Sequence, residues 1–133
     1  MPYRIVGDGA EALVQLLLVT TRTTGRWIIP KGNVDFNMSP YRAAEQEAEE
    51  EAGVRGEIAR QPIGVFRYRK RLCSGITATA KVVVFPLRVT EELDDWQERS
   101  VRLRKWFSAD EAMEAVGELD LREIIRSFWP RSP

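Results

Sequence analysis

Three glutamates in the segment 41–53 are the residues of this sequence best placed to do chemistry. Glu47, Glu50 and Glu51 are spaced i, i+3 and i+4, so on a helix their carboxylates share one face. Like charges at these spacings repel, and residues 45–51 include no lysine or arginine that would offset the repulsion. A solvated acidic face is the ordinary interpretation of such a helix. A divalent cation would relieve the repulsion, which favours a metal site here.

The loop that precedes this helix can add a further oxygen ligand. Lys31-Gly32 can bring backbone oxygen close to the same carboxylates, because glycine allows a close approach. Carboxylate and carbonyl oxygens are hard ligands that suit magnesium, manganese or calcium. The spacing therefore predicts an oxygen-ligated divalent site between this loop and the helix.

Composition narrows the remaining chemistry. The 133-residue chain has no histidine and one cysteine, Cys73, which excludes Ser-His-Asp and Cys-His catalysis, histidine-ligated zinc and an internal disulfide. Its 20 basic and 20 acidic residues cancel, which excludes a uniformly basic nucleic-acid binder. Apolar runs such as 16–19 are far shorter than a membrane helix of about 20 residues. We expect a cytoplasmic protein without nucleic-acid or membrane partners.

The elements that must position these residues alternate between strands and helices. Apolar patterning predicts strands over 3–6, 12–20, 27–29, 54–58, 63–71, 76–88 and 101–107. Ser39 and Pro40 open a helix that runs through Glu51 and ends at Gly53. A capping box at 108–111 opens a second helix, Asp120 caps a third, and 91–98 forms an acidic loop. We predict one layered α/β (α+β) domain over 1–133.

Arginines accompany the candidate metal site. Arg67, Arg69 and Arg71 alternate along one predicted strand and share a face, and a second basic group lies within 99–105. Ordinary surface charge explains such residues when they stand alone. Beside a metal site they become candidates for phosphate binding, because arginine binds phosphate through bidentate, charge-assisted hydrogen bonds.

The segment 32–54 resembles the Nudix box. That motif reads Gly, five residues, Glu, seven residues, Arg-Glu, an aliphatic residue, any residue, Glu-Glu, any residue, Gly and an aliphatic residue. The chain matches it in register at Gly32, Glu47, Ala48, Glu50, Glu51, Gly53 and Val54. It departs at two positions, because Met38 replaces the first Glu and Gln46 replaces the Arg. We expect these two changes to be coupled, with Gln46 donating a hydrogen bond toward Glu47.

Three further segments, 63–66, 95–98 and 102–107, resemble the diphosphoinositol polyphosphate phosphohydrolase branch of that family. The resemblance implies the Nudix fold, a mixed β-sheet sandwiched between helices. It also implies metal-dependent hydrolysis of a diphosphate linkage in a small, highly phosphorylated substrate. The expected substrate is a diphosphoinositol polyphosphate, a dinucleoside polyphosphate or a similar nucleoside diphosphate derivative.

By position, the resemblance assigns roles to single residues. Glu47, Glu51 and the Gly32 carbonyl would hold Mg²⁺ or Mn²⁺, and Glu50 would be the base that activates water. Substrate contacts would come from Arg22, Arg71 and Arg102, with a contribution from Arg4. The protein would be a monomer or a small homo-oligomer.

Two other functions stay open. Loss of the Glu and Arg of the box motivates a non-catalytic Nudix-fold module that binds a nucleotide or a phosphorylated metabolite. Retention of Glu47, Glu50 and Glu51 argues against that module, which would have little reason to keep three repelling carboxylates. A structural acidic-helix protein is the third alternative, and failure to bind any divalent ion would favour it.

Overall fold

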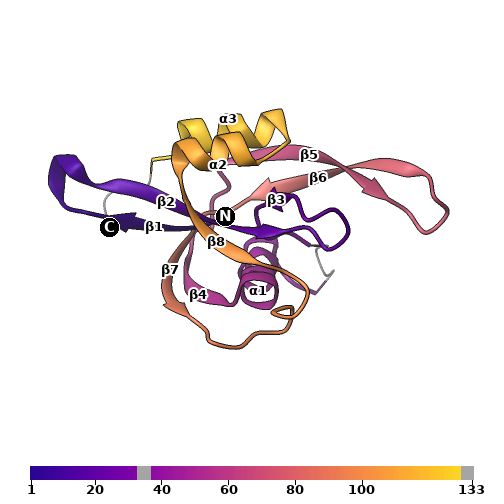
Figure 1. Ribbon diagram of the computed structural model, residues 1–133, viewed down its shortest axis with the longest axis horizontal. Helices are drawn as coiled ribbons and strands as arrows, with labels where there is room; N and C mark the ends of the chain where they lie inside the picture. The colour runs from indigo at the N-terminus through magenta and orange to yellow at the C-terminus, as the bar shows by residue number, and fades with distance from the viewer. Residues whose placement is uncertain (33–36, 130–133) are drawn as a thin grey trace.

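A mixed six-stranded β-sheet forms the centre of the computed structural model, which describes residues 1–32 and 37–129 (Figure 1). The strand order is β3-β2-β1-β7-β4, with β8 also paired to β2. Only the pairing of β1 with β7 is parallel among the described strands of this sheet. The strands are β1 (Pro2–Val6), β2 (Leu13–Thr20), β3 (Trp27–Ile28), β4 (Val54–Ile58), β7 (Leu87–Glu92) and β8 (Arg104–Ser108).

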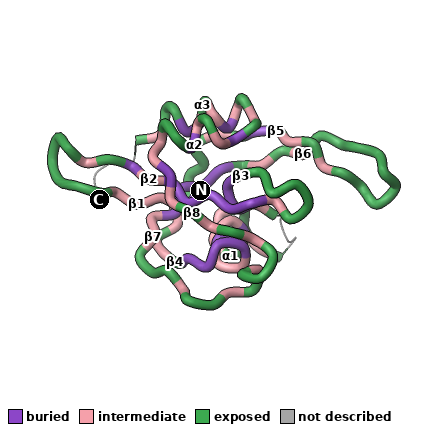
Figure 2. Tube along the Cα trace, viewed as in Figure 1, coloured by how far each residue is buried: buried purple, intermediate pink, exposed green. Residues whose placement is uncertain are grey.

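Helices cover both faces of this sheet, as the resemblance implied, and β2 shows why. Successive side chains of a strand point to opposite faces. Leu16 and Leu18 therefore pack in one core with residues of α2 (Ala109–Ala115) and α3 (Leu119–Ser127). Leu17 and Val19 pack in a second core against α1 (Pro40–Ala52). In Figure 2 the buried residues lie where β2 crosses the middle of the molecule, between these helix layers.

The start and the end of α1 follow from single residues. Pro40 occupies the first turn, as predicted, although the Ser39 side chain makes no capping hydrogen bond. Gly53 ends the helix in the left-handed conformation, with φ 65°, which glycine adopts at no steric cost. Strand β4 follows directly, so the helix end is anchored to the central sheet.

The predicted strand 76–88 is wrong, because two strands share that segment. β6 (Thr77–Val84) pairs with β5 (Gly64–Arg71) in a separate hairpin that projects from the body (Figure 1), while β7 joins the central sheet. Pro86 lies in the break, where its missing N–H prevents a continuous ladder. The hairpin is therefore an arm beside the sheet, attached at its base.

Two other boundaries also differ from the prediction. Glu91 and Glu92 belong to β7 and not to an acidic loop, and β8 begins only at Arg104. Glu118 is the N-cap of α3, while the carboxylate of Asp120 accepts a hydrogen bond from the backbone N–H of Arg67 at 2.8 Å. The capping box at 108–111 is confirmed with both of its hydrogen bonds. In the described part of the chain, every helix is too short or too polar to cross a membrane.

Candidate active site

Gly32, Glu47 and Glu51 come together at the edge of α1, as the spacing predicted. The Glu47 carboxylate lies against the Cα of Gly32 so closely that a side-chain carbon there would clash with it. Glu51 shares a hydrogen bond with Glu47, and its Oε1 accepts weakly from the backbone N–H of Lys31 at 3.4 Å. Loop and helix thus meet through two carboxylates, and a larger residue at position 32 would have to displace the Glu47 carboxylate.

Glu51 is almost fully buried, with 3% of its surface exposed. Burial and, to a smaller extent, the hydrogen bond with Glu47 raise the pKa of its carboxyl to about 9. The guanidinium of Arg102 acts in the opposite direction, with its Nη2 3.6 Å from Glu51 Oε1. A buried carboxyl beside a second carboxylate is costly to ionise unless positive charge is added.

These residues fit a divalent cation. The two carboxylates and the Gly32 carbonyl are hard oxygen donors, and the Glu47 carboxylate occupies the space that a Cβ at position 32 would fill. A cation would also neutralise the charge that burial disfavours at Glu51. Within residues 1–32 and 37–129, however, no three acidic or cysteine side chains cluster tightly enough to hold a metal by themselves.

Glu50 has a hydrogen-bond partner of its own on the helix. Its Oε1 accepts a hydrogen bond from Nε2 of Gln46 at 2.8 Å, one helical turn away. The expected hydrogen bond from Gln46 toward Glu47 is therefore wrong, since the amide serves Glu50 instead. Because position 46 replaces the arginine of the box, a neutral donor now orients the carboxylate that the resemblance assigns as base.

Sequence reasoning missed a lysine and a tyrosine beside the carboxylates. The Nζ of Lys31 lies 3.7 Å from the centre of the Tyr68 ring, a cation–π contact from the loop to β5. Burial lowers the pKa of Lys31, while Glu51 opposes that shift. Along β5, residues 68 and 70 share the less exposed face, and Arg67, Arg69 and Arg71 share the other. The strand register, which the sequence did not settle, decides which face meets the site.

Arg102 is brought to the site, where its contacts are with protein groups. Its Nε donates to Glu98 at 2.9 Å, its Nη1 donates to the Thr20 carbonyl at 3.0 Å, and its Nη2 faces Glu51. The guanidinium therefore joins the end of β2 to α1. Those contacts leave fewer donors for a phosphate group than the sequence suggested.

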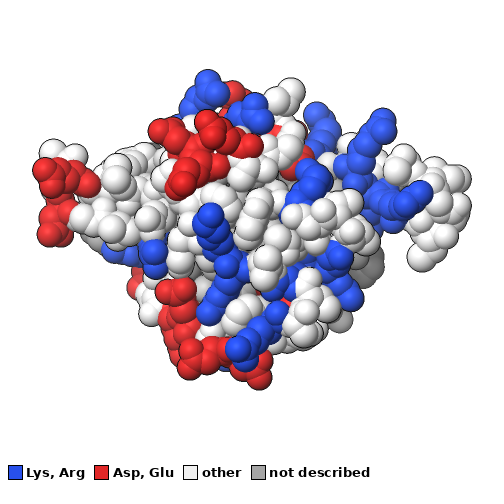
Figure 3. All heavy atoms as spheres, in the orientation of Figure 1, with Lys and Arg blue, Asp and Glu red and all other residues white. Residues whose placement is uncertain are grey.

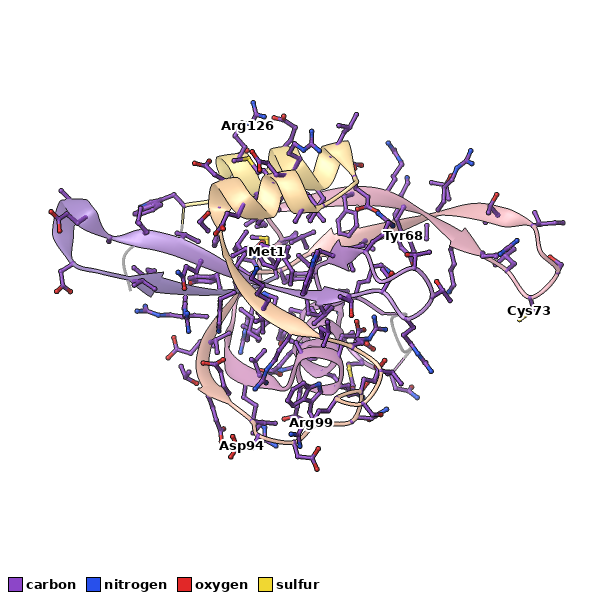
Figure 4. All side chains as sticks on the ribbon, viewed as in Figure 1. Met1, Tyr68, Cys73, Asp94, Arg99 and Arg126 are labelled. Atoms are coloured by element: carbon purple, nitrogen blue, oxygen red, sulfur yellow. The ribbon has the colours of Figure 1, made fainter. Side chains whose placement is uncertain are left out.

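The other predicted arginines do not converge on Glu47 and Glu51. Arg71 is exposed at the outer end of β5, on the arm whose tip carries Cys73 (Figure 4). Arg22 is exposed in the turn before β3. Arg4 hydrogen-bonds to Gln15 at 2.8 Å and stacks on Trp106 at 4.1 Å, on the sheet face that α1 covers. Basic side chains nevertheless gather over the β5–β6 arm in Figure 3.

A small cavity of about 130 Å³ opens beside Glu47. It lies between the loop 29–32, the first turns of α1 and the edge of β6, and its lining includes Gly32, Glu47 and Lys81. A larger cavity of about 780 Å³ lies elsewhere, between α3 and the loop after β4, and none of the α1 glutamates lines it. The chemistry therefore points to the smaller cavity.

The sequence profile of the NUDIX domain matches residues 5–128. The chain belongs to the Nudix family. Nudix hydrolase 12, mitochondrial, of Arabidopsis thaliana is 36% identical over 96% of this chain and 69% of its own length. Diphosphoinositol polyphosphate phosphohydrolase 2 of Rattus norvegicus is 36% identical over 76% of this chain, which spans just 53% of that relative. The family match and these hydrolase relatives assign the chain to the Nudix-type pyrophosphohydrolases.

Solved structures carry the same fold. An Ap4A hydrolase of C. elegans, in a binary complex, superposes on this chain with a TM-score of 0.63 and 19% sequence identity. The match includes 94% of this chain and 88% of the hydrolase chain. The NUDIX domain of Shewanella oneidensis NrtR, complexed with ADP ribose, has the same TM-score of 0.63 at 18% identity, covering 94% of this chain and 82% of its own. At these identities the likeness shows the Nudix fold alone.

Proposed function

We propose that this Nudix protein is a divalent-metal-dependent hydrolase of a phosphoanhydride bond in a small, highly phosphorylated molecule. The observation that carries the proposal is the meeting of Gly32, Glu47 and Glu51, with a buried carboxyl that is costly to ionise alone. Glu47, Glu51 and the Gly32 carbonyl would hold Mg²⁺ or Mn²⁺. The bound ion would neutralise phosphate oxygens and acidify a coordinated water.

Glu50 is the residue proposed to take the proton from the attacking water. Its carboxylate is half-buried on the same helix face as Glu47 and is oriented by Gln46. Attack by the water oxygen forms a new P–O bond while the anhydride P–O bond breaks, and the leaving phosphate departs with the electron pair of that bond. The proton then resides on Glu50 and is returned to solvent.

Positive side chains around the carboxylates support a polyanionic substrate. Lys31 lies beside Glu51, and Lys81 lines the small cavity with Glu47. We propose that these lysines contact the phosphates nearest the scissile bond. Arg71 and Arg22 remain proposed contacts to more distant phosphates, which suits a diphosphoinositol polyphosphate or a dinucleoside polyphosphate. Arg4 would add a further contact from β1, although its guanidinium already contacts Gln15 and Trp106.

A phosphate-release screen with Mg²⁺ and Mn²⁺ tests this function. The substrates are dinucleoside polyphosphates, nucleoside triphosphates, sugar nucleotides and diphosphoinositol polyphosphates. Hydrolysis that requires a divalent ion and survives Glu45→Gln is the expected result, because Glu45 pairs with Arg42 away from the site. Absence of turnover on every substrate, together with tight binding of one of them, would favour the binding module instead.

A further inference from the structure

The last turn of α1 carries Glu50 and Glu51, and the segment between β7 and β8 holds it. A helix leaves its last four carbonyl groups without partners inside the helix. Here the Glu50 carbonyl accepts from the N–H of Glu98 at 3.0 Å, and the Gly53 carbonyl accepts from the N–H of Leu93 at 2.8 Å. Backbone groups of a distant segment therefore replace the missing helical partners.

Arg104 completes this cap with its side chain. Its Nη1 donates to the carbonyls of Ala52 at 2.9 Å and Gly53 at 3.1 Å, and its Nη2 donates to the carbonyl of Leu93 at 2.9 Å. The positive charge also lies at the negative end of the helix dipole, which is a favourable place for a cation. One planar guanidinium thus joins the helix end to the segment that covers it.

Trp96 packs against the same point. Its ring lies 3.9 Å from the central carbon of the Arg104 guanidinium, and a side chain at position 53 would clash with it. The indole Nε1 is buried, and among the described residues it has no hydrogen-bond partner. Packing, and not a hydrogen bond, therefore fixes the ring between Gly53 and Arg104.

Arg102 and Arg104 both reach the last turn of α1, while Leu103 between them is 68% exposed. Arg102 meets the side chain of Glu51, and Arg104 meets the backbone that ends the helix. The two arginines therefore act on different parts of one turn. The sequence alone grouped them as equivalent surface charges.

We propose that Arg104 and Trp96 are positioning residues, which set the place of the Glu50 and Glu51 carboxylates by clamping the backbone of that turn. The inference rests on the proposed function, since it assigns these residues to the same hydrolysis. The contacts of Arg104 are with carbonyl groups and the Trp96 ring, so it acts through the helix and not on the substrate.

Arg104→Lys tests the clamp, because lysine keeps the charge but cannot bridge three carbonyls. Arg99→Lys is the matched control. Arg99 lies on the same covering segment (Figure 4), 5.9 Å from the Trp96 ring, with its side chain 60% exposed. For each protein we would measure the Tm, the Mn²⁺ affinity by electron paramagnetic resonance titration, and kcat and KM with Mg²⁺.

We expect Arg104→Lys to remain folded while its Mn²⁺ affinity and kcat each fall about tenfold, because small misplacements of catalytic groups are costly. KM should change little, and Arg99→Lys should match the parent. Trp96→Phe should keep near-parental values because the indole N–H has no partner, whereas Trp96→Ala should resemble Arg104→Lys.

A lower Tm for Arg104→Lys with unchanged Mn²⁺ affinity and kcat in the folded protein would overturn the positioning role. Arg104 would then only stabilise the end of α1. If Arg104→Lys does not fold, equal Mn²⁺ affinity in Trp96→Phe and Trp96→Ala would overturn it. A parent that binds Mn²⁺ but hydrolyses no substrate would refute the proposed function. The Mn²⁺ affinities of the parent and the variants would then still test whether Arg104 and Trp96 position the carboxylates. No Mn²⁺ binding by the parent would overturn both.

Discussion

Glu51 and the amino group of Met1 give the metal-free protein two opposing dependences of stability on pH. Burial raises the pKa of Glu51 from 4.5 to about 9, so between these values the folded state holds a proton that the unfolded state has lost. The free energy of unfolding from this group therefore falls as pH rises. Burial lowers the pKa of the Met1 amino group from 8.0 to about 5, and its contribution rises with pH.

The magnitudes follow from these values. One proton of difference corresponds to about 1.4 kcal/mol per pH unit, so between pH 6 and pH 8 the contribution of Glu51 falls by about 3 kcal/mol. The contribution of Met1 rises by about 2 kcal/mol, because its unfolded amino group, with a pKa of 8.0, is itself losing its proton near pH 8. The two changes have opposite signs and nearly cancel in the parent. The chain has no histidine, which removes the side chain that ordinarily titrates in this range.

Replacing Glu51 by glutamine removes one of the two contributions. In EDTA, we expect the free energy of unfolding of Glu51→Gln to rise by about 2 kcal/mol from pH 6 to pH 8, while the parent stays nearly flat. Urea unfolding followed by tryptophan fluorescence measures both, with Glu45→Gln as the control that behaves like the parent. Saturating Mg²⁺ should make the parent more stable at pH 8 than at pH 6, because the ion selects the ionised carboxylates. Identical pH profiles of parent and Glu51→Gln in EDTA would refute the account of the buried carboxyl.

Three further predictions concern the residues around the site. Gly32→Ala should lower divalent-ion affinity at least tenfold, measured by isothermal titration calorimetry, because its side chain would displace Glu47; unchanged affinity would show that the loop takes no part in the metal site. Arg71→Ala should weaken long polyphosphate substrates by about 1.5–3 kcal/mol more than short diphosphates in kcat/KM, and equal losses across chain lengths would count against a phosphate contact. Met38 and Gln46 line one groove, so Met38→Glu with Gln46→Arg should raise kcat by more than the two single variants together, whereas simple additivity would mean that the positions are independent.

Much of the fold could be predicted because local signals agreed with the final structure. Gly53 ended α1, the span 54–58 of β4 was predicted without error, and the capping box at 108–111 opened α2. Pro86 marked a possible break within 76–88, but the prediction ran one strand through it because the apolar run continues on both sides. The division into two strands is decided by pairing, since β7 lies between β1 and β4 while β6 pairs with β5.

The candidate site was predictable where one helix sets the spacing and unpredictable where distant segments meet. Glu47 and Glu51 follow from an i, i+4 spacing, and Gly32 from the adjoining loop. Lys31 on Tyr68 and Arg104 on the end of α1 depend on strand register and loop path, which leave no pattern in the local sequence. A residue's type and spacing could not separate an arginine that caps a helix from one that meets solvent.

The most direct test of the central claim is a side-by-side turnover assay of the parent and Glu51→Gln. Each protein is given a diphosphoinositol polyphosphate and a dinucleoside polyphosphate, with Mg²⁺ and with EDTA, and products are followed by ³¹P NMR. The account predicts turnover by the parent only with Mg²⁺, and a loss of at least about a hundredfold in Glu51→Gln, which remains folded. Near-parental turnover in Glu51→Gln, or turnover by the parent in EDTA, would contradict it.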